Sequence, residues 1–287
     1  MKKISAIVLF VPLFYASLFA QTPLLKVTLP EDVAKEIAER NSRITISSAN
    51  DKKEVDAYEY ADCASLQEVT IEEGIEKIGE YAFLGCSSLR SVTLPSTIKE
   101  IGEGAFRECV SLESINIPEG VKEIAPYLFS WDENLKEVTI PVSVEDIGRN
   151  AFAYCKNLRE VTLPPGLKHI GPNAFSYCES LTEIVVPDNV EELESYVFSD
   201  CKNLRKATLP GNSNLLGELI FTGCDNIEEI ITTSYIPAPF DCGSPLFDPS
   251  EKNLWNQCKL NIPPGTEQKY RDAPGWHLFF ISDKNGM

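Results

Sequence analysis

The sequence CSSLRSVTLPSTIKEIGEGAF, from Cys86 to Phe106, sets the pattern of most of the chain. It recurs in both directions with a period of 23 residues. One column holds Cys63, Cys86, Cys109, Cys155, Cys178, Cys201 and Cys224, with Asp132 in its one gap. Another holds Phe83, Phe106, Phe129, Phe152, Phe175, Phe198 and Phe221. Four more columns, which begin at Leu66, Val69, Ile71 and Ile78, carry almost only leucine, isoleucine or valine, so the chain is an internal repeat.

Each repeat is predicted to form one coil of a solenoid. The segment 92–94 alternates apolar and polar residues as a strand does, and Pro95 ends it. Gly102 permits a tight turn, after which Phe106 enters the core. A single coil cannot bury its own apolar face, so the coils must stack. The sequence predicts an α/β-type solenoid, a right-handed parallel β-solenoid of leucine-rich-repeat type, over residues 42–233.

The N-terminal 41 residues are predicted to have two parts. Residues 1–20 combine a basic start with an apolar run, which is typical of a signal peptide cleaved after Ala20. An uncleaved membrane anchor is the alternative, although Pro12 interrupts the run. Residues 21–41 are predicted to form an N-terminal cap, in which Val33 and Ile37 share one face of a short helix.

The composition changes after the last repeat. Residues 234–287 are rich in proline and include two of the three tryptophans. A solenoid needs terminal caps because its last coil would otherwise expose core. We therefore expect residues 234–287 to form a C-terminal cap.

The formal net charge of −17 excludes some partners. An excess of acid repels phosphate backbones and anionic membrane surfaces. We expect neither nucleic acid as a partner nor membrane insertion after signal removal, and we expect a monomer. Solubility alone is a sufficient explanation of the charge.

The pattern C-x-x-L-x-x-V-x-L-P-x-x-I-x-x-I-G-x-x-A-F, from Cys86 to Phe106, resembles the BspA-like leucine-rich repeats of secreted bacterial proteins. The tail from Leu260 to Thr266, with Tyr270, Trp276 and Phe279, is similar to the cap these proteins often carry. The resemblance implies cell-surface adhesion and binding of host or matrix proteins. The expected location is therefore the periplasm, the cell surface or the outside of the cell.

Nine cysteines in an exported chain suggest disulfides. Stacked cysteines in successive coils point the same way about 4.8 Å apart, too far for bridging. We expect a spine of free thiols, and no zinc site because no C-x-x-C occurs. Cys242 and Cys258 lie outside the repeat and are the one predicted disulfide.

The sequence offers no catalytic arrangement. It holds only His169 and His277, and His169 replaces an acidic residue of a surface column. No nucleophile elbow, zinc-binding H-E-x-x-H or phosphate-binding glycine loop is present. We therefore predict a non-enzymatic protein without cofactor or metal.

Two columns are candidate binding surfaces. Glu137, Glu160 and Glu183 stack like charges in consecutive coils, either on a wet surface or where a basic partner binds. The position before the cysteine carries rings in three consecutive coils: Trp131, Tyr154 and Tyr177. Such rings either bind a partner or pack on one another. The favoured function is an exported interaction module for a host or matrix protein; the alternatives are carbohydrate binding along the rings and a periplasmic scaffold.

Overall fold

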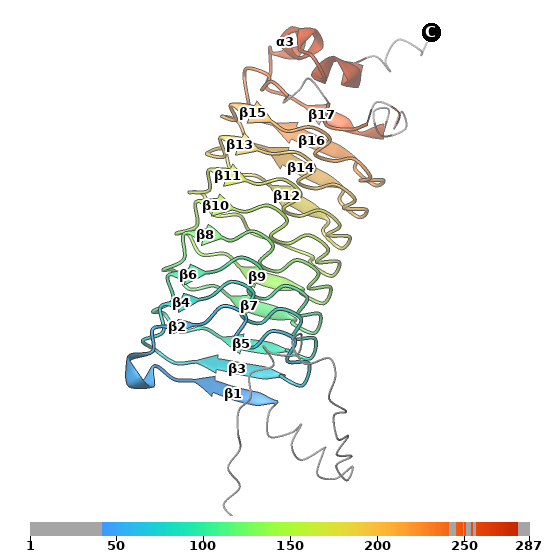
Figure 1. Cartoon of the computed structure of the whole chain (residues 1–287). Helices are drawn as coiled ribbons and strands as arrows, with labels where there is room; N and C mark the ends of the chain where they lie inside the picture. The colour runs from blue at the N-terminus through green and yellow to red at the C-terminus, as the bar shows by residue number, and fades with distance from the viewer. Residues whose placement is uncertain (1–41, 241–244, 249, 251–253, 255–256, 281–287) are drawn as a thin grey trace, which may run out of the picture. The chain divides into compact units, whose positions relative to one another are not determined.

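Two short strands recur in most coils of the computed structural model (Figure 1). Strands at the same place in successive coils pair in parallel, and in the described chain they form five separate sheets. The structure describes residues 42–240, 245–248, 250, 254 and 257–280. All of these belong to one compact unit. The predicted signal peptide and N-terminal cap, with Val33 and Ile37, lie outside the described residues.

The first strand of each coil builds the main ladder, which is parallel in every pairing. Its strands are β1 (Arg43–Ile46), β3 (Glu68–Ile71), β5 (Ser91–Thr93), β7 (Ser114–Asn116), β9 (Glu137–Thr139), β12 (Glu183–Val185), β14 (Lys206–Leu209), β16 (Glu229–Thr232) and β17 (Lys259–Asn261). In β7, β9 and β12 the central isoleucine or valine is buried and both of its neighbours are exposed. This alternation is the one the sequence predicts.

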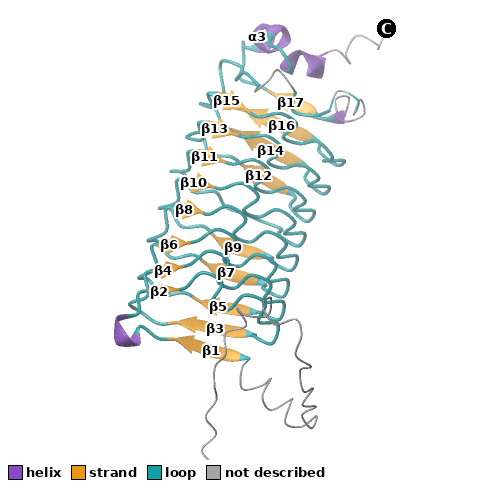
Figure 2. Ribbon diagram, in the orientation of Figure 1, coloured by secondary structure: helices purple, strands orange, loops and turns teal. Residues whose placement is uncertain are grey.

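The second strand of each coil builds a narrower parallel ladder (Figure 2). Its strands are β2 (Glu54–Val55), β4 (Lys77–Ile78), β6 (Glu100–Ile101), β8 (Glu123–Ile124), β10 (Asp146–Ile147), β11 (His169–Ile170), β13 (Glu192–Leu193) and β15 (Leu215–Leu216). One short 3-10 helix, η2 (Ala49–Asp51), precedes β2. The coils thus form a parallel β-solenoid of about eight turns, which confirms the predicted fold.

A turn segment closes each coil and forms a third row of backbone hydrogen bonds. The amide of Phe83 donates to the carbonyl of Ala105 over 2.8 Å, for example. The residue before each cysteine position has a left-handed φ of 56° to 71°. Glycine adopts this conformation without a side-chain penalty, which explains Gly85 and Gly223 in that column.

Aromatic and thiol side chains fill the core behind this turn. The phenylalanines from Phe83 to Phe221 are fully buried and stack at ring-centroid distances of 5.0 to 5.9 Å. The thiol of Cys109 donates to the carbonyl of Phe83 over 3.2 Å, and other column cysteines repeat this bond. The described cysteines of the repeat column, from Cys63 to Cys201, carry free thiols. Cys242 lies outside the described residues, so its pairing with Cys258 stays a prediction.

The core continues beyond the last repeat. Strand β17 extends the main ladder, and Phe247 packs against Phe221 at 6.3 Å. The helices α3 (Glu267–Asp272) and η4 (Trp276–Phe280) follow. Trp276 is buried, and its indole nitrogen donates to the carbonyl of Ala238 over 2.9 Å. Within the described part of residues 42–280, no helix has the length and apolar character of a membrane span.

Candidate binding surface

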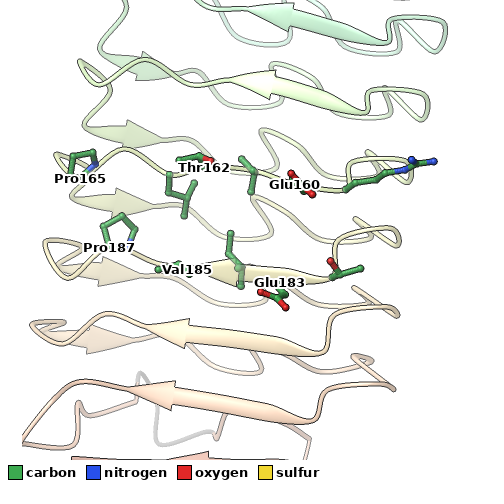
Figure 3. Close-up of a pocket in the computed structure, with 11 residues that line it drawn as sticks. Glu160, Thr162, Pro165, Glu183, Val185 and Pro187 are labelled. Carbon is green, nitrogen blue, oxygen red and sulfur yellow. The ribbon is translucent and has the colours of Figure 1, made fainter.

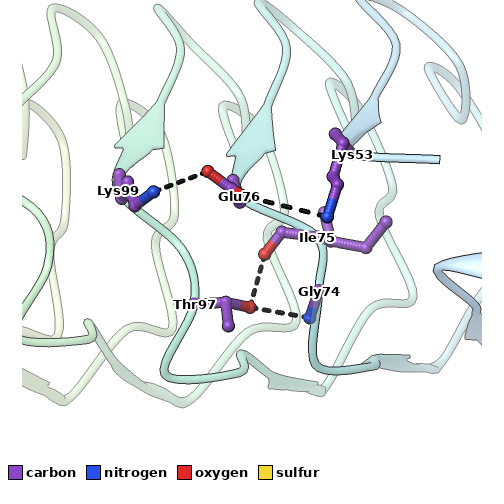
Figure 4. A network of polar contacts seen from close by, with 6 residues as sticks. All are labelled: Lys53, Gly74, Ile75, Glu76, Thr97 and Lys99. Carbon is purple, nitrogen blue, oxygen red and sulfur yellow. Dashed lines mark hydrogen bonds and ion pairs between the residues drawn. The ribbon is translucent and has the colours of Figure 1, made fainter. Parts of the chain in front are cut away.

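Ion pairs between neighbouring coils neutralise many of the acidic side chains. Glu76 illustrates the arrangement: its carboxylate lies 2.6 Å from the ammonium of Lys99 and 3.8 Å from that of Lys53 (Figure 4). The hydrogen bond from Lys99 lowers the pKa of Glu76. Thr97 adds two bonds between the same coils, donating to Ile75 and accepting from Gly74. Further pairs join Lys77 to Glu100, Lys136 to Glu113, Lys156 to Glu133, Lys168 to Glu145 and Arg205 to Glu228.

The first residue of the main-ladder strands follows a charge pattern of its own. At the C-terminal end, Glu183, Lys206, Glu229 and Lys259 are paired in register, so the charges alternate. At the N-terminal end, Arg43 pairs with Glu68 at 3.0 Å. Between these regions the predicted stack of Glu137, Glu160 and Glu183 is present and exposed. Among the described residues, none of these three glutamates has an ion-pair partner.

The main ladder is interrupted where these like charges meet. Residues 159–163 form no strand, although the sequence repeats there as it does elsewhere. Within the described chain, the amides of Val161 and Leu163 donate to no backbone carbonyl. Like charges directly opposite each other weaken strand pairing, and Glu160 meets a like charge on both sides, although Glu123 and Asp146 remain paired in register in the second ladder. A third break in the main ladder lies between β5 and β7. Their first residues are Ser91 and Ser114, so no like charges meet there.

A groove of about 690 Å³ lies over this interruption (Figure 3). One coil contributes Glu160, Thr162 and Pro165, and the next contributes Glu183, Val185 and Pro187. Val185 is 63% exposed, an unusual value for an apolar side chain. The groove, which we call the acidic groove, therefore joins two carboxylates without an ion-pair partner in the described chain to an apolar centre, beside a coil segment that forms no strand.

The predicted ring column is a tight stack. Trp131 lies on Tyr154 at 3.9 Å between ring centroids, and Tyr154 lies on Tyr177 at 4.3 Å, with planes within 7°. The inner faces of the stack are therefore covered by neighbouring rings. At the far end, the carboxylate of Asp200 raises the pKa of Tyr177 to about 12. Whether the stack binds a partner stays a prediction.

The rings and the glutamates line different recesses. The acidic groove includes none of the three rings. Trp131 lines a separate recess that includes none of the three glutamates. The three rings and the three glutamates therefore belong to two separate candidate sites and not to one shared surface.

The family model for the BspA-type leucine-rich repeat region matches residues 53–179 and 122–238, in six copies. The chain belongs to the BspA-type leucine-rich repeat family. Comparison with curated proteins gives no significant match.

Several solved structures are similar to this BspA-type chain. A leucine-rich cell surface protein of Faecalibacterium prausnitzii is 26% identical, over 68% of this chain and 65% of its own, with a TM-score of 0.48. The chain thus spans less than two thirds of that protein's length. The leucine-rich repeat protein of T. pallidum is 28% identical over 66% of this chain and 78% of its own, with a TM-score of 0.47. One from Bacteroides ovatus is 20% identical over 80% and 73%, with a TM-score of 0.43.

The two histidines of this BspA-type protein occupy unlike surroundings. His169 lies on β11 with its Nδ1 atom 3.6 Å from a carboxylate oxygen of Glu192, and His277 is exposed on η4. Among the residues the structure describes, no group of three or more His, Cys, Asp or Glu is placed to hold a metal. That the protein has no catalytic site and no cofactor stays a prediction.

One buried group was not identified from the sequence. Asp132, which fills the gap in the cysteine column, is fully buried. Its Oδ1 atom accepts a hydrogen bond from the amide of Cys109, while Oδ2 has no partner. Burial raises the pKa of this carboxyl well above its ordinary value. The gap in an otherwise buried column was the signal that could have identified it.

Proposed function

We propose that the protein is an exported, non-catalytic interaction module that binds a host or matrix protein, and that the acidic groove receives a basic, extended segment of that partner. The observation that carries the proposal is the groove between Glu160 and Glu183. Membership of the BspA-type family supports a repeat-based interaction module.

Charge supports a basic partner. The glutamates at the groove have no ion-pair partner in the described chain, whereas Glu76, Glu113 and others are paired between coils. A lysine or arginine placed between Glu160 and Glu183 would relieve the repulsion between them. Complementary charge of this kind raises the association rate and selects the partner.

The backbone supports an extended segment. The unpaired amides of Val161 and Leu163 lie in the coil that forms one side of the groove. Backbone amides without a carbonyl partner can donate to an extended peptide, and neighbouring apolar side chains supply specificity. Val185, Pro165 and Pro187 provide that apolar surface.

Biolayer interferometry tests the proposal. The protein is measured against immobilised matrix proteins and against a ten-residue lysine- and arginine-rich peptide, with an acidic peptide as control. We expect binding to the basic peptide that weakens as salt rises, because exposed charges are screened. Glu160→Gln with Glu183→Gln should weaken it at least tenfold.

The matched control is Glu123→Gln with Glu100→Gln, which removes the same charge from the second ladder. Equal loss in both double variants would show only a general effect of charge. Absence of binding to the basic peptide and to every matrix protein would reject the proposed function and favour a periplasmic scaffold.

A further inference from the structure

A second recess lies at the N-terminal end of the ring stack. Its volume is about 580 Å³, within the range of about 300–1,000 Å³ typical of small-ligand sites. It extends over the column that precedes the cysteines, from Asp62 and Gly85 through Glu108 to Trp131. The recess is separate from the acidic groove, so this inference does not depend on the proposed function.

Trp131 closes the recess with the free face of its ring. One face of the indole lies on Tyr154, the ring of the following coil. The preceding coils carry no ring in this column, because Glu108 and Gly85 stand there. The opposite face of Trp131 is therefore turned toward the recess, and the side chain is 38% exposed.

The other walls supply both hydrogen-bond donors and acceptors. The guanidinium of Arg107 lies 3.1 Å from the carboxylate of Glu108. The carboxylate of Asp62 lies over Gly85, where a Cβ atom would be only 2.5 Å from its Oδ1 atom. The absence of a side chain at Gly85 thus leaves room for both Asp62 and the recess.

We propose that this recess binds one pyranose ring of a carbohydrate, stacked on Trp131. A pyranose presents a face of C–H groups, and the face of an indole carries the negative part of its quadrupole. Hydroxyl groups at the rim of the sugar require donors and acceptors together. Arg107 supplies donors, and Asp62 and Glu108 supply acceptors.

The same chemistry argues against a cationic side chain as the ligand. A lysine or arginine over Trp131 would gain a cation–π contact. It would also lie beside Arg107, which already neutralises Glu108 at 3.1 Å. Because Asp62 is the one further charged group among the described residues that line the recess, donors and acceptors lie together there, which suits a hydroxylated ring.

The test is isothermal titration calorimetry, which reports binding whether or not Trp131 is present. The probes are three trisaccharides, of β-linked glucose, galactose and N-acetylglucosamine, up to concentrations on the order of 10 mM. We expect a saturable heat of binding with at least one of them. The Glu160→Gln, Glu183→Gln double variant should retain this response, which separates this site from the acidic groove.

Two variants examine the recess itself. Trp131→Gly removes the ring without backbone strain, because glycine occupies the same left-handed position at Gly85 and Gly223. Glu108→Tyr extends the stack by one ring over the free face of Trp131. Each should weaken the response at least tenfold, whereas Tyr177→Gly, at the far end of the stack, should change it less than twofold.

Several results would overturn the proposal. One is no saturable response to any of the three sugars. Another is a response that survives both Trp131→Gly and Glu108→Tyr. A response to the basic peptide that both variants abolish, with none to the sugars, would identify a cation site instead.

Discussion

Asp132 accepts a 2.7 Å hydrogen bond from the backbone amide of Cys109, the residue that precedes it in the same column. In other coils a thiol occupies this place and donates to a phenylalanine carbonyl. The carboxyl of Asp132 is fully buried, and its Oδ2 atom has no partner. A neutral carboxyl could donate as the thiols do, whereas a charged one could not.

Asp132→Cys should therefore stabilise the protein at neutral pH. A buried acceptor without a partner costs about 1–3 kcal/mol, and cysteine restores the recurring thiol. We expect the free energy of unfolding at pH 7, measured with urea, to rise by an amount within that range. Cys155→Asp is the reciprocal control, and it should lower the free energy of unfolding.

The sign of the pH dependence follows from the raised pKa of Asp132. The folded protein holds this proton more tightly than the unfolded chain, whose carboxyl titrates near about 3.9. Stability from the neutral carboxyl is present below that value and is lost as pH rises toward the folded pKa. The gain from Asp132→Cys should thus increase from pH 5 to pH 8. An unchanged gain would show that Asp132 is not protonated in the fold.

Variants of the ring stack can separate the contribution of backbone conformation to stability from that of ring stacking. Trp131, Tyr154 and Tyr177 have φ values of 69°, 64° and 58°, in the left-handed region. Replacing all three by glycine removes stacking worth about 0.5–1.5 kcal/mol per pair and relieves the backbone. Replacing them by valine removes the same rings but keeps a Cβ atom in the left-handed region, which costs about 1–2 kcal/mol per residue relative to glycine.

We therefore expect the triple-valine variant to melt well below the triple-glycine variant in thermal unfolding followed by circular dichroism. The wild-type protein provides the reference for the stacking contribution. Equal melting temperatures for the two triple variants would mean that backbone strain at these positions is negligible.

Most of the solenoid could be predicted from the sequence because its core residues recur at a fixed interval along the chain and each coil contacts only its neighbours. Phe83 and Cys86 recur at a fixed period, and this period alone requires stacked coils. The left-handed turn before each cysteine position was not predicted. Glycine, aspartate and tyrosine share that column, and they have in common a left-handed backbone conformation rather than a side-chain property. The interrupted ladder at Glu160 was not predicted either. It involves residues of neighbouring coils, so it is a property of register rather than of any single repeat.

Replacing one of the like charges by a positive charge should restore strand pairing at the interruption of the main ladder. Glu160→Lys would place a lysine between Glu137 and Glu183 in three consecutive coils, matching the alternation at Glu183, Lys206 and Glu229. An exposed ion pair contributes about 0.2–1 kcal/mol, so the gain in global stability is small. The local effect is larger, because two strand pairings can form.

Amide hydrogen exchange measures that local effect. Exchange at Val161 and Leu163 should slow in Glu160→Lys, and binding of the basic peptide should disappear. The control Glu123→Lys carries the same change of charge on β8 and should leave both amides unchanged. Unaltered exchange in Glu160→Lys would mean that charge repulsion does not keep the ladder open.

We propose that residues 234–287 protect the end of the solenoid, and Trp276 provides the test. Its ring is 1% exposed, lies against Tyr270 at 5.1 Å edge to face, and is fixed by the bond to Ala238. Trp276→Ala should cost about 3–5 kcal/mol, as for other buried aromatic side chains. Because a solenoid transmits stability from coil to coil, hydrogen exchange should accelerate first in β16 and β17 and last in β3. Trp276→Phe, which keeps a ring but loses the indole donor, should show a smaller loss. Equal acceleration in every coil would indicate instead that the solenoid unfolds as one cooperative unit.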